Sequence, residues 1–300
     1  MTDSPRTRGL AGGADLFDTR HVFRTRVGTA FAILCFLATA LGIFVLAVLL
    51  IDIWRDGAHR LSLDFLRNGQ SRFPDRTGIK PALYGSLWVL VITAVVSFPL
   101  GVGTAIWLEE YAPDNRWKKL IQTNIANLAG VPSIVYGMLG LAIFVRAMAM
   151  GRSVLAAGFT LALLILPVII ISSQEAIRAV PSSIRLGAYA LGATRWEMIR
   201  FHVLPIALPG ILTGTILALS RAIGEAAPLI VVGALAFVPL PPRGLLDDFT
   251  VVPIQIFNWI SRPQREFQEI AAAGSIVLLV VLLTLNAAAI YLRNRYSRKW

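Results

Sequence analysis

Residues 175–205 read EAIRAVPSSIRLGAYALGATRWEMIRFHVLP and lie between two long apolar runs. The segment carries six charged residues, which exclude a membrane crossing, because each ion at the bilayer centre costs about 2.5–3.5 kcal/mol on insertion scales. Pro181 is expected to end one helix, and Ser182 or Ser183 to cap the next. The pattern predicts a short helix of small and apolar residues that either lies in the lipid headgroups or fits a groove in another protein.

The composition is that of an integral membrane protein. Of the 300 residues, 56% are hydrophobic and only 15% are charged, and the mean hydropathy is +0.69. A soluble domain carries roughly 25% charged residues. The net charge of +11 does not indicate nucleic acid, since the basic residues lie in the tails and between apolar runs. Contact with membrane lipid and orientation in the membrane explain them better.

The sequence offers little for catalysis or metal binding. Cys35 is the single cysteine, and the three histidines are scattered at His21, His59 and His202. No disulfide framework, metal cluster or catalytic triad is therefore predicted. No GxxxxGK[ST] phosphate loop is present, so we expect no cofactor in this chain. If its work needs ATP, then ATP and Mg²⁺ are bound by a partner chain.

Six apolar segments reach the length of about 20 residues that a membrane-spanning helix needs. The first follows an Arg-rich tail and is too long for a signal-peptide core, so it is expected to be a retained transmembrane helix. The fifth is longer than a span requires and contains Pro205, Pro209 and Pro228, which predict a kink or an interfacial turn. The segments are 27–52, 84–108, 121–147, 153–177, 203–236 and 269–292.

Six spans place both termini on one side, and the basic tails predict that this side is the cytoplasm. The 53–83 and 237–268 loops are then extracytoplasmic, as solvated connections or as a contact surface for a partner. The expected organisation is a cytoplasmic tail at 1–26, a first transmembrane helix at 27–52 and an extracytoplasmic loop at 53–83. A transmembrane domain at 84–292, with a cytoplasmic loop at 178–202, and a cytoplasmic tail at 293–300 complete it.

The fifth span contains the sequence SRAIGEAAP, which starts at Ser220. Arg221 and Glu225 are one helical turn apart, so on a continuous helix they share a face and pair. Intramembrane arginines usually face a bundle interior or a water-filled path, and the guanidinium fork fits phosphate or carboxylate oxygens. We expect an anion site on a translocation path, in which the carboxylate keeps binding loose. The alternative is a self-neutralising pair that only locks helix packing.

The third span contains the sequence GVPSIVYG, which starts at Gly130. Gly130 and Pro132 are expected to break the helix, while Ser133 and Tyr136 bring hydroxyl groups to membrane depth. Broken helices often line a substrate path. The alternative is close helix packing, which we expect for Gly137 and Gly140.

Glu175 and Arg178 lie at the inner end of the fourth span. They are candidates for an inner gate. They also fit charged side chains that reach the membrane surface from a helix end.

Several motifs together resemble the permease subunit of an ATP-binding-cassette (ABC) importer, and more narrowly the PstA-type subunit of the phosphate-specific transport system. The resemblance covers about residues 80–295. It implies an all-α integral membrane protein of the type I importer permease fold, with six transmembrane helices and a cytoplasmic coupling helix, in a bacterial inner or cell membrane. The motifs are EEYAP (109–113), GVPSIVYGMLGL (130–141), ALGATRW (190–196), LP (204–205), SRAIGEAAPL (220–229) and PIQIFNWISRPQREFQ (253–268).

The resemblance also implies partners and residue roles. A second, PstC-type permease chain, two PstB-type ATPase subunits and an extracytoplasmic PstS-type phosphate-binding protein would complete the transporter. Arg221 matches the family's membrane arginine on the phosphate route, beside Glu225. The cytoplasmic loop would dock into a cleft of the ATPase through Arg185, Leu186, Gly187, Ala188, Tyr189, Leu191, Gly192 and Ala193.

Two departures from the family pattern affect the details. The loop of the family typically reads REAAYALG, whereas this chain has Leu186 in place of the glutamate and Gly187 in place of an alanine. Ala226 stands where threonine is common.

The alternatives to phosphate import are import of another oxyanion, such as sulfate or molybdate, or of an organic substrate by the same architecture. A secondary transporter or channel and a membrane scaffold are the other classes.

Overall fold

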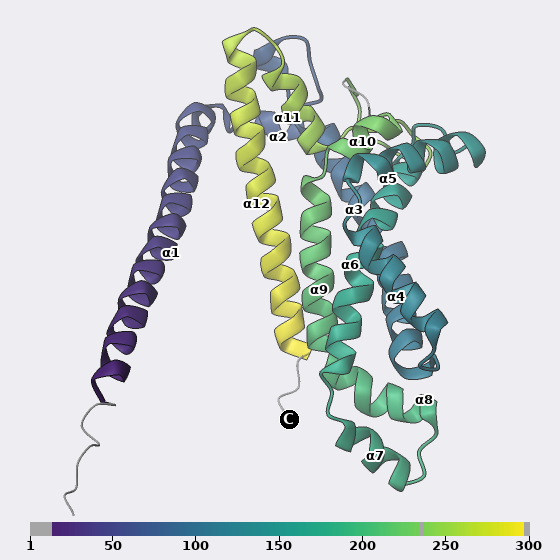
Figure 1. The fold of residues 1–300 in the computed structure, drawn as a ribbon. Helices are drawn as coiled ribbons and strands as arrows, with labels where there is room; N and C mark the ends of the chain where they lie inside the picture. Colours follow the sequence, from purple (N-terminus) through teal and green to yellow (C-terminus); the bar gives the residue numbers. More distant parts are fainter. Residues whose placement is uncertain (1–13, 235–236, 297–300) are drawn as a thin grey trace, which may run out of the picture. The chain divides into compact units, whose positions relative to one another are not determined.

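The computed structural model describes residues 14–234 and 237–296, and its regular elements are helices, apart from an isolated β-bridge between Ser153 and Asp248. The α-helices, shown in Figure 1, are α1 (Ala14–Gly57), α2 (Leu63–Arg67), α3 (Lys80–Ile106), α4 (Arg116–Ala129), α5 (Ser133–Gly140), α6 (Val154–Arg178), α7 (Ser182–Ala190), α8 (Arg195–Met198), α9 (Leu204–Gly224), α10 (Ala227–Val232), α11 (Val252–Ile260) and α12 (Arg265–Tyr296). Two 3₁₀ turns (Ala58–Arg60 and Pro74–Arg76) and three π-helical turns (Trp107–Tyr111, Leu141–Ala147 and Ile199–Val203) connect or extend them.

The all-α membrane fold predicted from the composition is confirmed. Five helical segments of the described residues are long and apolar enough to cross a membrane, and the pair α4 and α5 makes a sixth if the two count as one span. This pair is bent by 101°. The five segments are Val27–Arg60, Lys80–Tyr111, Val154–Arg178, Arg195–Gly224 and Arg265–Tyr291.

The observed spans differ from the predicted ones at their ends. The fifth ends at Gly224, earlier than predicted, and α10 is a separate short helix; residues 235–236 lie outside the described residues. Residues 14–26 of the predicted tail continue into α1, and residues 1–13 and 297–300 lie outside the described residues.

The chain divides into two compact units, Met1–Ile53 and Trp54–Trp300. The described part of the first unit consists of most of α1, whose segment from Val27 onward has a mean hydropathy of 2.9 in its most apolar window. The second unit contains all the other helices, and α6 lies at its centre with 67% of its apolar window buried.

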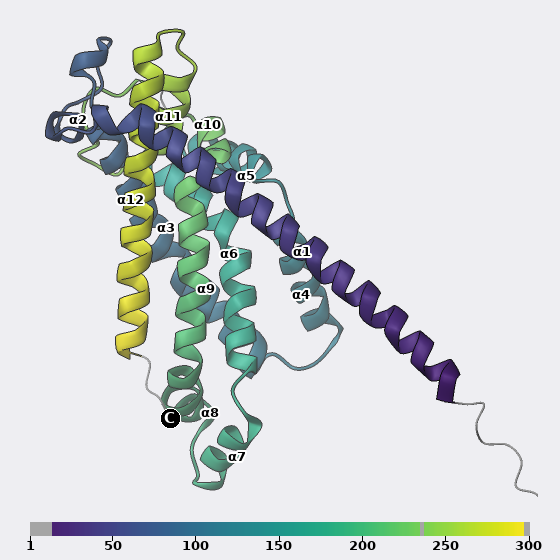
Figure 2. The same cartoon turned by 90° about the vertical axis from the view of Figure 1, so that its left-hand side faces the viewer.

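Small residues let α3 and α6 pack closely. A Cβ atom on Gly158 would lie 2.5 Å from Ile92 Cγ2, and one on Gly101 would lie 2.6 Å from Ile169 Cγ2. Membrane helices are held together mainly by such close packing, because lipid supplies no hydrophobic drive between them. Helix α9 packs against α6 on another side, and the two run alongside each other in Figures 1 and 2.

The segments 54–83 and 237–268 are more than solvated connections. Phe65 and Ile79 of the first segment are buried with Trp259 of the second and with Ile270 of α12. The rings of Phe65 and Trp259 have centroids 6.0 Å apart. These apolar side chains, spaced along short helices, form a second core at the end of the unit that carries α2 and α11 (Figure 1).

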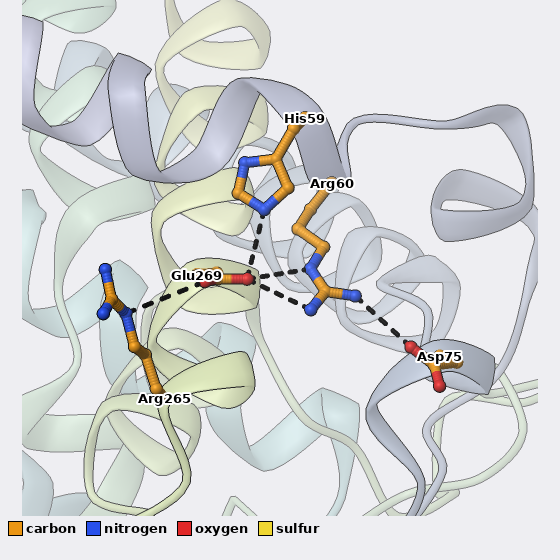
Figure 3. Close-up of polar contacts among 5 residues, drawn as sticks. All are labelled: His59, Arg60, Asp75, Arg265 and Glu269. Atoms are coloured by element: carbon orange, nitrogen blue, oxygen red, sulfur yellow. Dashed lines mark hydrogen bonds and ion pairs between the residues drawn. The ribbon is translucent and has the colours of Figure 1, made fainter.

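A group of charged side chains fastens the same region to α12 (Figure 3). Oε2 of Glu269 lies 3.1 Å from His59 Nε2 and 3.0 Å from Arg60 Nη2. Arg60 also reaches Asp75, at 3.3 Å, and Arg265 lies 3.9 Å from the other carboxylate oxygen of Glu269. These five residues are called the Glu269 cluster below.

Candidate functional site

The segment with Arg221 lies where the fifth span ends. Helix α9 stops at Gly224, and Glu225 has an extended backbone with φ −78° and ψ 116°. Pro228 explains the break, because a proline donates no backbone hydrogen bond and its ring collides with the carbonyl group four residues earlier, here that of Gly224. Arg221 Nε donates to Glu225 Oε1 at 3.2 Å. The predicted pair is present, but Glu225 lies beyond the helix end and not on a shared helical face.

The Arg221 side chain is 60% exposed in this chain, whereas that of Glu225 is only 18% exposed. Within the described part of the chain, the two terminal nitrogens of the Arg221 guanidinium have no hydrogen-bond acceptor. Its neighbour Ser220 is engaged instead, since its hydroxyl donates to Ile216 O and contacts Asn286 Oδ1 on α12. Arg221 therefore has donors free for an anion.

The second predicted motif forms the break between α4 and α5. The chain turns by 101° across the residues from Gly130 to Pro132, as the glycine and proline predict. The Tyr136 hydroxyl donates to Leu128 O at 2.9 Å. The same carbonyl group, at the end of α4, also accepts a hydrogen bond from the backbone N–H of Val131 at 3.1 Å. Tyr136 is buried and serves the break, while Ser133 begins α5 and is partly buried.

The two motifs meet in space through small residues. A Cβ atom on Gly137 would lie 2.7 Å from Pro228 Cα, so α5 and α10 are in close contact. This confirms the expectation that Gly137 serves helix packing. No hydrogen bond in the described residues joins Ser133 or Tyr136 to Arg221 or Glu225. The shared path of these four residues stays a prediction.

The predicted coupling segment forms α7 and the turn that follows it. Leu186, Tyr189 and Leu191 are 68%, 44% and 88% exposed, whereas Ala188 is 2% exposed and packs inward. One face of α7 therefore presents apolar side chains to its surroundings. Figure 1 shows α7 and α8 at the end of the unit opposite to α2 and α11.

The ends of α7 differ in part from the prediction. Pro181 occupies the N-cap position without a side-chain hydrogen bond, so the predicted caps, Ser182 and Ser183, are instead the first residues of the helix. Proline fixes its own φ, here −56°, and so restricts the direction in which the chain enters the helix. Gly192 has φ +81°, a left-handed conformation that favours glycine, and no atom other than its chain neighbours lies within 4 Å of a Cβ built on it or on Gly187. Ala193 is partly buried.

Two neighbouring carboxylates after α3 make ion pairs with other helices, Glu109 with α6 and Glu110 with α7. Glu109 and Glu110 lie in the π-helical turn after α3. Glu109 Oε1 accepts hydrogen bonds from Gln174 at 2.9 Å and from Arg178 at 2.7 Å. Glu110 Oε1 accepts two from Arg185, at 3.1 and 2.8 Å. These five residues are called the Glu109–Glu110 cluster below.

Of the two predicted gate residues, Glu175 and Arg178, only Arg178 belongs to the Glu109–Glu110 cluster. Arg178 pairs with Glu109 of another helix, while Glu175 is exposed and makes no side-chain hydrogen bond among the described residues. Sequence reasoning assigned no role to Glu109 or Glu110, although EEYAP was among the motifs. The sequence did contain a signal for ion pairs here. Two adjacent acidic residues lie at the end of an apolar span, and the basic segment 178–200 is predicted to lie on the same side of the membrane.

No group of three or more metal-ligating side chains occurs in the described residues. What the geometry offers is an exposed guanidinium at a broken helix and an apolar helix face tied to the membrane core. The chemistry it fits is binding and movement.

Comparison with known proteins gives relatives among membrane permeases. Over 256 residues, the chain is 32% identical to the probable ABC transporter permease protein YqgI of Bacillus subtilis, covering 81% of this chain and 87% of that protein. It is 33% identical over 223 residues to the phosphate transport system permease protein PstA 1 of Mycobacterium tuberculosis, covering 74% and 71% of the two chains.

Solved structures share the fold at low sequence identity. A chain of a bacterial alginate ABC transporter, in complex with an alginate-bound periplasmic protein, aligns with a TM-score of 0.68 and 15% identity, covering 93% of this chain and 98% of that one. A chain of the MetNI methionine ABC transporter in an inward-facing conformation aligns with a TM-score of 0.59 and 18% identity, covering 73% and 97%.

The sequence signature of the binding-protein-dependent transport system inner membrane component matches residues 97–299, which is more than half of the chain. The fold, the apolar helices and the full-length relatives agree with that match. The chain therefore belongs to this family of multi-pass membrane proteins and is the permease subunit of an ABC importer.

Proposed function

We propose that the chain is a PstA-type permease that carries inorganic phosphate across the membrane. The observation that carries this proposal is Arg221, whose side chain is 60% exposed at a broken helix, near the end of a membrane span. A planar fork of donors fits the oxygens of a phosphate better than a point charge does. Named phosphate transport permeases among the relatives support the same substrate.

The exposure of Arg221 also favours a second permease chain. A charged side chain that faces lipid is costly, by up to about 2.5–3.5 kcal/mol at the bilayer centre on insertion scales and by less toward the end of a span, where Arg221 lies. Intramembrane charges accordingly line a bundle interior or a water-filled cavity. We infer that the face carrying Arg221 borders a path shared with a PstC-type partner, and that Ser133 and Tyr136 lie near the same path.

Glu225 has a role in release within this proposal. It holds the Nε donor of Arg221 at 3.2 Å and leaves the terminal nitrogens for the substrate. A nearby carboxylate repels an anion and weakens its binding, and a transport site must bind loosely enough to let its substrate leave.

The partners and orientation follow from the exposed face of α7. Leu186, Tyr189 and Leu191 form an apolar surface next to Gly192, which suits docking into a cleft of a separate ATPase that binds ATP and Mg²⁺. In this proposal, α7 and both chain ends face the cytoplasm. The opposite end, with α2 and α11, would then meet the extracytoplasmic phosphate-binding protein.

Uptake of labelled phosphate in a strain lacking the gene tests the proposal. Complementation with the natural chain should restore uptake, and Arg221→Gln should lower it roughly tenfold to a hundredfold, because a hydrogen bond to a charged group contributes about 1.5–3 kcal/mol. Arg221→Lys keeps the charge without the fork and should retain an intermediate rate. Arg146→Gln is the matched control, since Arg146 is another exposed arginine near the end of a span.

Two results would contradict the proposal. Unchanged uptake by Arg221→Gln, with normal amounts of protein in the membrane, would reduce Arg221 to a packing role. Restoration of sulfate or molybdate uptake, with none of phosphate, would keep the architecture and replace the substrate.

A further inference from the structure

Arg185 belongs to the segment expected to contact an ATPase, yet its guanidinium is directed into its own chain. Nε and Nη2 donate to Glu110 Oε1 at 3.1 and 2.8 Å. Nη1 donates to Val180 O at 2.7 Å, and Nη2 also donates to Ile177 O at 2.9 Å. An arginine has five N–H donors, so few remain for another protein, and the side chain is only 21% exposed.

One carbonyl acceptor, that of Ile177, lies in the last turn of α6, and the other, that of Val180, lies two residues past the end of the helix. Carbonyl groups in the last turn of a helix lack partners within the helix, and the partial negative charge of that end attracts a cation. Arg185 supplies both the donors and the charge. It therefore joins the first turns of α7 to the last turn of α6, across the bend at Pro181.

Glu110 connects the same guanidinium to a third helix. Its side chain is 7% exposed in the π-helical turn that continues α3. Removing a partner from such a buried carboxylate would leave its charge uncompensated. The adjacent Glu109, 11% exposed, holds Gln174 and Arg178 of α6. The ends of α3, α6 and α7 are thus tied together by two successive carboxylates.

The exposed face of α7, which carries Leu186 and Tyr189, has apolar and aromatic side chains and no ion pair among the described residues. Leu186 and Tyr189 are exposed there, while Arg185 and the buried Ala188 turn inward. The helix divides its residues between an apolar contact face and an inner face that is fixed by ion pairing. The charge of Arg185 is neutralised within the chain.

We propose that Arg185 and Glu110 are positioning residues, which form a strut that makes α7 move together with α3 and α6. Arg185 acts through Glu110 and the carbonyl groups of α6, and it makes no contact with the ATPase. This inference rests on the proposed function in one respect, namely that a partner ATPase displaces α7. Loss of the strut would leave α7 docked but would let it move without the membrane helices.

The test uses the assembled transporter, purified through a tag on this chain and reconstituted in lipid vesicles. Phosphate uptake and ATP hydrolysis are measured on the same sample for the natural chain, Glu110→Gln and Arg185→Gln. We expect both variants to co-purify with the ATPase and to hydrolyse ATP, while phosphate carried per ATP falls roughly tenfold. Arg185→Lys, which keeps the charge with fewer donors, should recover part of the loss. Arg200→Gln is the control, since Arg200 is exposed near α8.

Hydrogen exchange of residues 182–190 in the same samples gives a readout that needs no substrate. It should rise in both variants and stay unchanged in Arg200→Gln. The strut is overturned if uptake per ATP and exchange are both unchanged in Glu110→Gln. It is also overturned if Arg185→Gln alone loses the ATPase, since that result would make Arg185 a contact residue. A natural chain that couples ATP hydrolysis to another substrate would refute phosphate as the substrate, and the exchange result would still decide on the strut.

Discussion

The two ends of the second unit are each held by ion pairs, but the pairs are built differently. At one end, the single carboxylate of Glu269 is shared by His59, Arg60 and Arg265, whose side chains are 54%, 26% and 86% exposed. At the other end, the neighbouring carboxylates of Glu109 and Glu110 are 11% and 7% exposed, against 22% for Glu269. Each pairs with an arginine of its own: Arg178, which is 62% exposed, and Arg185, which is 21% exposed, so Glu110–Arg185 is the most buried pair of the two ends.

The difference in exposure indicates a different structural role for the ion pairs at each end. Exposed ion pairs are screened by water and salt and contribute little to stability. The Glu269 cluster thus fastens a segment that the Phe65 and Trp259 core already holds. Buried pairs fix geometry, because breaking one leaves an unpaired charge. In the proposal above, the Glu110–Arg185 pair sets the position of α7, a helix with few buried residues of its own.

Removal of the two kinds of carboxylate should give the largest contrast. Glu110→Ala leaves the Arg185 charge with only its two carbonyl acceptors, and should lower the free energy of unfolding by roughly 2–3 kcal/mol, somewhat below the value for a fully buried pair. Glu269→Ala should lower it by about 1 kcal/mol or less. Thermal unfolding of the purified protein in detergent measures both. Equal decreases in the free energy of unfolding, or a larger decrease for Glu269→Ala, would contradict the claim that the Glu110 pair contributes more than the Glu269 cluster.

A smaller effect is expected from Asp247, in the segment that leads to α11. The backbone N–H of Arg243 and then that of Gly244 donate to its carboxylate, both at 2.8 Å, and lower the pKa of Asp247. A carboxyl group whose pKa is lower in the folded state stabilises the fold above its unfolded pKa of about 3.9. That contribution is lost as the pH falls through the lower, folded value.

Unfolding temperatures measured from pH 5 downward check this prediction. The natural chain should lose slightly more stability below about pH 4 than Asp247→Asn does, because the amide does not titrate. Parallel curves for the two proteins would show that the loop hydrogen bonds are not linked to folding.

Most of the fold could be predicted, because a membrane-spanning helix requires a continuous run of about 20 apolar residues, which can be recognised in the sequence. The length of the apolar runs predicted the helices, and Gly130 with Pro132 predicted the bend between α4 and α5. The end of α9 was harder. Arg221 and Glu225 fit one continuous helix by spacing, and only the effect of Pro228 on the carbonyl group of Gly224 shows why the helix stops.

The candidate site could be predicted only in part. Arg221 and the exposed apolar face of α7 were visible as unusual residue types in their surroundings. The bonds of Glu109 and Glu110 join residues 65 to 75 positions apart, so they depend on how α3, α6 and α7 pack. The contact between Gly137 and Pro228 is of the same kind. No local pattern specifies which distant helix a side chain meets.

The most direct test of the strut measures whether α7 moves with α3. Cys35, the single cysteine, is replaced by serine, and spin labels are attached at Gly103→Cys on α3 and at Ser183→Cys on α7, two exposed positions. We predict one narrow distance distribution that stays the same with and without ATP in the assembled transporter, and a broad one when Glu110→Gln is added. A distribution that shifts with ATP in the natural background, or that Glu110→Gln leaves narrow, would contradict the strut.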